Sequence, residues 1–162
     1  MSECFEAVFP LLREGYRLKI CPVGNSMIPF LRGERDDAVL FLPPDGYVYK
    51  KNDIILFRTK SGMYVLHRVC RAGGNCVYTL GDGNTAMEGP ISREEIVALT
   101  EYIIRKGKII RSDDRRYIFL VSVWRFIRPV RPLVIKSYTA TRRSIYWIKY
   151  IIRKICSRTN VS

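Results

Sequence analysis

Short apolar runs separated by glycine and proline fill the chain from residue 16 to about residue 111. Each run has the length of a β-strand, and several alternate apolar with polar side chains, which is the two-residue period of a strand. Many short strands with this punctuation favour a compact, coiled β sheet or partial barrel. We therefore predict a mainly β fold, with strands at residues 16–20, 38–42, 53–57, 63–70, 76–80, 94–102 and 108–110.

The two ends of the chain differ from this β region. Residues 1–15 predict a short helix that Pro10 interrupts. Residues 113–162 predict a basic, amphipathic helical tail, in which Ser144 is placed to cap a helix over residues 145–156. The expected organisation is an N-terminal helix (1–15), a β domain (16–112) and the tail (113–162).

Charge is distributed very unevenly along the chain. Residues 1–100 hold 12 basic and 12 acidic side chains, whereas residues 101–162 hold 16 basic and 3 acidic ones, so the second part carries the whole net charge of +13. A neutral domain with a basic tail predicts an anionic partner for the tail. Aromatic side chains lie among the tail's basic residues, which suits a membrane surface better than nucleic acid. Two ordinary helices packed on the β domain are the alternative.

Targeting signals and metal sites are not evident in the sequence. Residues 1–10 lack the basic and apolar regions of a signal peptide, and no apolar run approaches the roughly 20 residues that span a bilayer. We expect a cytoplasmic protein, with attachment to the inner face of the membrane if the tail binds lipid. No cofactor or metal is expected, because no group of cysteines has metal-ligand spacing.

The five cysteines do not form an obvious disulfide framework. Their number is odd, and free thiols in a reducing compartment are the favoured interpretation. Cys70 and Cys76 flank a Gly-Gly turn and could face each other across a hairpin, so a disulfide between them stays open.

Ser26 and His67 offer the minimum parts for acyl transfer. A serine hydroxyl is a poor nucleophile until a base takes its proton, and His67 is the only histidine in the chain. Gly24 would let the backbone approach a substrate closely, with nearby N–H groups binding an oxyanion. Asp82 is the first candidate to orient His67 and stabilise its charged form. The structural alternatives are a turn cap for Ser26, a hydrogen-bonded strand histidine for His67 and a hairpin turn for Asp82.

Four motifs in this order carry a resemblance to a known family. The segment Val-Gly-Asn-Ser-Met-Ile-Pro-Phe-Leu at 23–31 resembles the nucleophile box of the S24/S26 serine peptidases, which include signal peptidases and LexA-like repressors. Residues 52–57 are similar to the family's Gly-Asp-apolar strand, with Asn52 where glycine is usual. Leu-His-Arg-Val at 66–69 and Leu-Gly-Asp-Gly-Asn at 80–84 resemble the Ser/His branch, closest to SipW-like enzymes, whereas the lysine branch has lysine in place of the histidine.

The resemblance covers roughly residues 16–100 and implies a function. It implies a Ser26/His67 serine endopeptidase that cleaves a peptide or protein precursor, as in signal-peptide processing. Glu88 lies about where SipW-like sequences have a second acid, so it could share the orienting role with Asp82. The matched nucleophile box implies that Gly24, Asn25, Met27 and Pro29 bind the oxyanion or substrate.

Two other functions stay open at this point. The first is a non-catalytic module of the same fold that docks extended peptides along a strand edge. The second is a regulator tethered to membrane or nucleic acid by its tail. A LexA-like DNA-binding domain would not fit in the fifteen residues before Tyr16.

Overall fold

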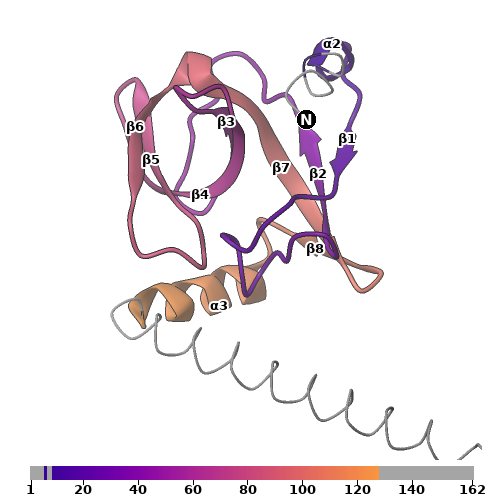
Figure 1. Cartoon of the computed structure of the whole chain (residues 1–162), viewed down its shortest axis with the longest axis vertical. Helices are drawn as coiled ribbons and strands as arrows, with labels where there is room; N and C mark the ends of the chain where they lie inside the picture. The colour runs from indigo at the N-terminus through magenta and orange to yellow at the C-terminus, as the bar shows by residue number, and fades with distance from the viewer. Residues whose placement is uncertain (1–5, 7–8, 128–162) are drawn as a thin grey trace, which may run out of the picture. The chain divides into compact units, whose positions relative to one another are not determined.

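The computed structural model describes residue 6 and residues 9–127, and it is mainly β (Figure 1). The predicted fold class is confirmed at this level. The elements are α2 (Phe9–Arg13), β1 (Leu18–Ile20), β2 (Asp37–Phe41), β3 (Ile54–Arg58), β4 (Tyr64–Gly73), β5 (Cys76–Leu80), β6 (Glu88–Ser92), the 3₁₀ turn η1 (Arg93–Glu95), β7 (Ile96–Arg105), β8 (Lys108–Arg111) and α3 (Arg115–Phe126).

The strands form one open antiparallel sheet of eight strands. Its order is β1-β2-β7-β3-β4-β5-β6, and β8 pairs with β7 beside this path. The ten-residue β7 pairs with β2 along one edge, while its other edge pairs first with β3 and then with β8. Register shifts interrupt the β2–β7, β3–β7, β4–β5 and β5–β6 ladders, with the extra residues in β7, β4 and β6. Since a bulge bends its strand and increases the local twist, these interruptions agree with the curled ribbon of β3 to β6 in Figure 1.

Both faces of the sheet bury apolar side chains, and β3 contributes to both. Ile54 and Leu56 lie in one cluster, whereas Ile55 and Phe57 lie in the other, as the alternation of a strand requires. The first cluster is also closed by Leu12 of α2 and by Tyr117 and Val121 of α3, so the two helices cover the same side of the sheet. The cleft described below lies beside the covered side, near the loop before β2, whereas His67 lies on the face of β4 that carries the second cluster.

The tail boundary expected at residue 113 is wrong, because α3 is part of the folded domain. Tyr117 and Val121 are buried in the core, and the Asp114 carboxylate caps the helix by accepting from the backbone N–H of Arg116 at 2.7 Å. The chain divides into units 1–126 and 127–162. The helix predicted over residues 145–156 lies outside the described residues.

Among the local predictions, the favoured free thiols are confirmed, whereas the strand pattern needs adjustment. Within the described residues, residue 6 is helical and α2 runs from Phe9 to Arg13 with Pro10 in its first turn, a position that needs no backbone donor. Strand β6 was not expected. Cys70 and Cys76 are free thiols, since the residue opposite Cys76 is Gly73. Asn52 adopts φ +84°, the left-handed conformation that asparagine tolerates, at the position where the resembling family has glycine.

No helix in the described part of the chain is long and apolar enough to cross a membrane.

Candidate active site

The Ser26 loop connects β1 to β2 and is closed at its neck by two glycines. Gly24 has φ +95°, and a Cβ on Gly33 would lie 2.2 Å from the Gly24 carbonyl oxygen, so only glycine fits at Gly33. The backbone N–H of Gly33 donates to the Gly24 carbonyl at 3.2 Å, and that of Glu34 donates to the Pro22 carbonyl at 2.8 Å. The neck therefore holds half-buried Ser26 on a short projecting loop.

His67 lies in the middle of β4 and is held from two sides. Its side chain is 3% exposed, and its ring centroid lies 6.2 Å from that of Phe57 on the neighbouring strand β3. The Nδ1 atom lies 3.2 Å from Oε2 of Glu88, the first residue of β6. An ionised carboxylate only accepts hydrogen bonds, so a neutral His67 ring in this contact carries its proton on Nδ1 and has an unprotonated Nε2.

The environment of His67 favours its neutral form. Burial lowers the pKa of His67 below its ordinary value, and this effect outweighs the opposing charge and hydrogen bond of Glu88 and the charge of Asp82. A neutral imidazole with Nε2 unprotonated is the form that a general base requires.

The turn after β5 packs against both His67 Nε2 and the backbone of Ser26. A Cβ on Gly81 would lie 3.0 Å from His67 Nε2 and 2.5 Å from the Ser26 carbonyl oxygen, so the Gly81 backbone fits tightly between them. The backbone N–H of Gly83 donates to that same carbonyl at 2.7 Å. The Gly-Asp-Gly-Asn turn thus holds the Ser26 loop on the side of the imidazole that carries Nε2.

The sequence led us to expect a contact between Asp82 and His67. The Asp82 carboxylate instead forms a buried ion pair with Arg68. Arg68 Nη2 lies 2.7 Å from Asp82 Oδ2, and Arg68 Nε lies 2.9 Å from Oδ1. The two side chains are 1% and 4% exposed. The residue after His67 faces away from the imidazole, so its guanidinium draws the Asp82 carboxylate to the other side of the strand. The acid that contacts Nδ1 is Glu88 instead.

Helix α3 extends this ion pair, and sequence reasoning missed its contribution. The Tyr117 hydroxyl lies 2.7 Å from Arg68 Nη2, and Trp124 Nε1 donates to the Asp82 carbonyl oxygen at 2.6 Å. Arg125 Nη2 donates to the Val69 carbonyl at 2.8 Å. The only available signal was Arg68 within the Leu-His-Arg-Val motif, because nothing in the sequence assigns the polar atoms of α3 to partners so far along the chain.

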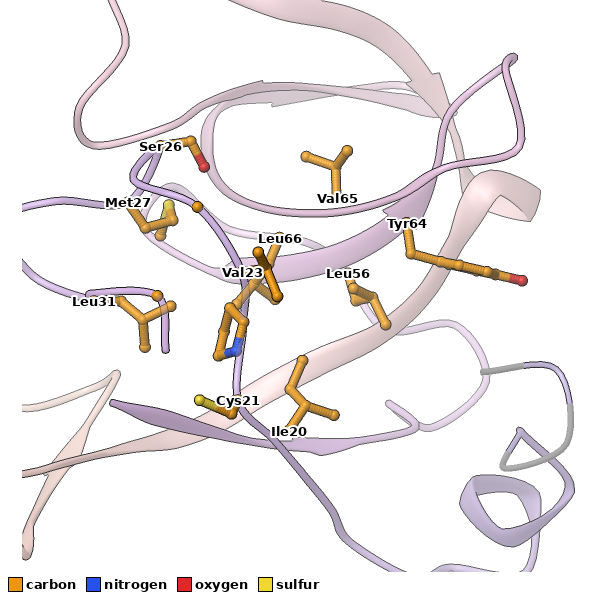
Figure 2. A pocket seen from close by; sticks show the side chains of 13 residues that line it. Ile20, Cys21, Val23, Ser26, Met27, Leu31, Leu56, Tyr64, Val65 and Leu66 are labelled. Atoms are coloured by element: carbon orange, nitrogen blue, oxygen red, sulfur yellow. The ribbon is translucent and has the colours of Figure 1, made fainter. Parts of the chain in front are cut away.

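An apolar cleft of about 200 Å³ adjoins Ser26. Figure 2 shows Ser26 on its loop at one end of the cleft and Tyr64 of β4 at the other. Gly24 and Met27, two of the four residues predicted to bind the oxyanion or substrate, line the cleft. Asn25 and Pro29 do not line it. The Pro29 carbonyl instead accepts from Arg105 at 2.7 Å, which ties the loop to β7.

The cleft also borders an unpaired stretch of strand. Strand β4 pairs with β3 from residue 64 onward, but with β5 only from Arg68 onward. Among the described strands, none therefore pairs with the second edge of residues 64–67. The backbone N–H groups of Ser26 and Met27 likewise donate to no backbone carbonyl within residues 9–127. Backbone groups without a backbone partner among the described residues therefore border the cleft on both sides.

Comparison of the chain with protein-family models, with curated proteins and with solved structures gives no match.

We expect Glu88→Gln to change the pH dependence of any His67-dependent reaction. The base must be neutral, so activity rises with pH through the pKa of His67, which burial holds below 6.5. Removing the Glu88 charge removes the main influence that raises this pKa, so the acid limb of kcat/KM should move to still lower pH. The rate should also fall, because the imidazole loses its orienting acceptor.

The size of that fall is limited by solvent. The Glu88 side chain is 43% exposed, so the loss should stay well short of the roughly 10⁴-fold effect of neutralising a fully buried orienting acid. The control is Glu95→Gln, which also alters a carboxylate beside β6. It should not move the acid limb of the pH dependence of kcat/KM. An acid limb that moves to higher pH in Glu88→Gln would contradict the assignment.

Proposed function

We propose that this chain is a Ser26/His67 serine endopeptidase of the S24/S26 type, which cleaves a peptide or protein precursor. The observation that carries the proposal is the position of Gly81 against both His67 Nε2 and the Ser26 backbone, while His67 Nδ1 contacts Glu88. A nucleophile, a base and a group that orients the base are the parts that this chemistry needs.

In the proposed reaction, Ser26 Oγ attacks the scissile carbonyl carbon and His67 Nε2 takes the hydroxyl proton. The imidazolium then gives this proton to the leaving amine, and an acyl-enzyme forms on Ser26. Glu88 stabilises the imidazolium through Nδ1–H. The backbone N–H groups of Ser26 and Met27 are the candidate donors to the oxyanion. Water releases the acyl group by the same proton transfers in reverse.

The cleft supports an extended substrate with an apolar side chain near the cleaved bond. A peptide that pairs with the open edge of residues 64–67 would add a strand to the sheet and pass Ser26. The mainly apolar lining, which includes Ile20, Leu31 and Leu56, would accept an apolar side chain but would leave a buried charge unpaired. The same edge would serve a non-catalytic peptide-binding module, so catalysis has to be tested directly.

Covalent labelling by a fluorophosphonate probe is the direct test. We expect the full chain to be labelled once, at Ser26, as located by peptide mass spectrometry. Ser26→Ala should lose the label, and Ser61→Ala, which alters an exposed turn serine, should keep it. An unlabelled but folded wild-type chain that still binds extended peptides would favour the binding module.

A further inference from the structure

Helix α3 is apolar on two opposite faces, of which the described residues cover only one. Its inner face buries Tyr117 and Val121 against the sheet. Its outer face exposes Phe119, Val123 and Phe126, spaced by four and three residues so that they form one stripe. Phe119 is 66% and Phe126 is 87% exposed. A large aromatic stripe left in water indicates a surface that binds something.

Basic residues at the start of α3 and in the sequence after it point to an anionic partner. Arg115 and Arg116 are exposed on the first turn of α3. Residues 128–162, which follow the helix directly, contain nine basic residues and no acidic one. Their aromatic residues, which include Trp147, are interspersed with these charges. Apolar side chains that insert, next to basic side chains that neutralise anionic headgroups, are the combination that holds a protein on a lipid surface.

We infer that the outer face of α3, together with the basic segment after it, docks this protein on an anionic lipid membrane. A lipid surface accounts for both features, because the acyl boundary takes up the phenylalanine stripe and the headgroups attract the arginines. Nucleic acid would account for the charge but not for a stripe of aliphatic and phenylalanine side chains on one helix face. This inference concerns binding alone and does not depend on the proposed peptidase activity.

Hydrogen bonds on the inner face of α3 hold the helix on the domain. Trp124 and Arg125 donate to backbone carbonyls of the turn after β5 and of β4, and Tyr117 contacts Arg68. These bonds use the face opposite to the phenylalanine stripe. The outer face can therefore insert while α3 stays on the domain, so docking does not require the site to unfold.

Vesicle co-sedimentation of the full chain tests the inference. We expect binding to vesicles of phosphatidylglycerol with phosphatidylcholine, and much weaker binding to phosphatidylcholine alone. The double variant Phe119→Ser with Phe126→Ser should bind the anionic vesicles at least about tenfold less tightly, since burial of each phenylalanine contributes more than that factor. The matched control is Val48→Ser with Ile109→Ser, which removes two apolar side chains of similar exposure (66% and 65%) elsewhere on the domain and should bind as the wild type does.

Five results would overturn the inference. The first is a wild-type chain that does not bind anionic vesicles, and the second is an α3 double variant that binds them as tightly as the wild type. The second result would mean that the basic segment binds by charge alone, and the third, a complete loss of wild-type binding at high salt, would mean the same. The fourth is wild-type dimerisation that the α3 double variant abolishes, with no vesicle binding. The fifth is a preference for RNA over anionic vesicles.

A measurement on well-folded single variants keeps the test decisive if the double variant misfolds. Phe126→Trp places a fluorophore on the outer face, and Ile109→Trp places one on β8. With brominated phosphatidylglycerol in the vesicles, the fluorescence added by Phe126→Trp should be quenched, whereas that added by Ile109→Trp should not. Equal quenching of the two, or none in Phe126→Trp, would show that the outer face does not insert.

Discussion

Ser26→Ala and His67→Ala should each lower kcat for a cleaved precursor peptide by about 10⁶-fold, the loss expected when a nucleophile or its base is removed. The reason is that, in the proposed mechanism, the Ser26 hydroxyl and His67 Nε2 act as one unit in proton transfer. The double variant should therefore be hardly worse than either single variant. Ser61→Ala is the control on an exposed serine and should retain full activity.

His67 needs a second substitution because its side chain is buried. His67→Gln keeps a polar side chain of similar length, so thermal unfolding of this variant tells loss of the base apart from loss of the fold. His67→Lys should not restore full activity, because a lysine must be neutral to act as a base and this depends on how far the site depresses its pKa. Activity of Ser26→Ala within tenfold of the wild type would exclude the proposed mechanism.

The strands were predictable because local pattern determines them. Alternation and Gly/Pro punctuation located seven of the strands, including the hairpin of β4 and β5 around its Gly-Gly turn. Strand β6 was missed because Gly89 and Pro90 interrupt its pattern. Proline is tolerated there because β6 is the last strand of the sheet and lacks a neighbour on one side.

Pairing between distant side chains was not predictable in the same way. Sequence placed Ser26, His67, Asp82 and Glu88 in one site, but it ranked Asp82 above Glu88 as the partner of His67. The correct ranking depends on which acid lies on the same face of β4 as His67. Only the register of β4, β5 and β6 determines on which face each acid lies. The packing of α3 was hidden for a related reason, because a helix with two apolar faces does not reveal which one meets the sheet.

Asp82→Ala should lower the free energy of unfolding by about 3–5 kcal/mol, because it leaves the Arg68 guanidinium buried without its counter-ion. Burial alone would lower the pKa of Arg68, yet Asp82 and Tyr117 hold it above its ordinary value, so the group is charged. Asp113→Ala is the matched control. It breaks an Arg111–Asp113 pair of similar geometry at 3.0 Å in which both side chains are more than 60% exposed, and it should change stability little.

Urea unfolding followed by circular dichroism measures both variants. Arg68→Met combined with Asp82→Leu should recover part of the stability that Asp82→Ala loses, because it removes the unpaired charge. The recovery should be incomplete, since the Arg68 guanidinium also donates to the Asn52 carbonyl at 3.1 Å and lies within hydrogen-bonding distance of the Tyr117 hydroxyl. If Asp82→Ala were no more destabilising than Asp113→Ala, the carboxylate would be free of Arg68 in solution. It would then be available to His67 as the sequence predicted.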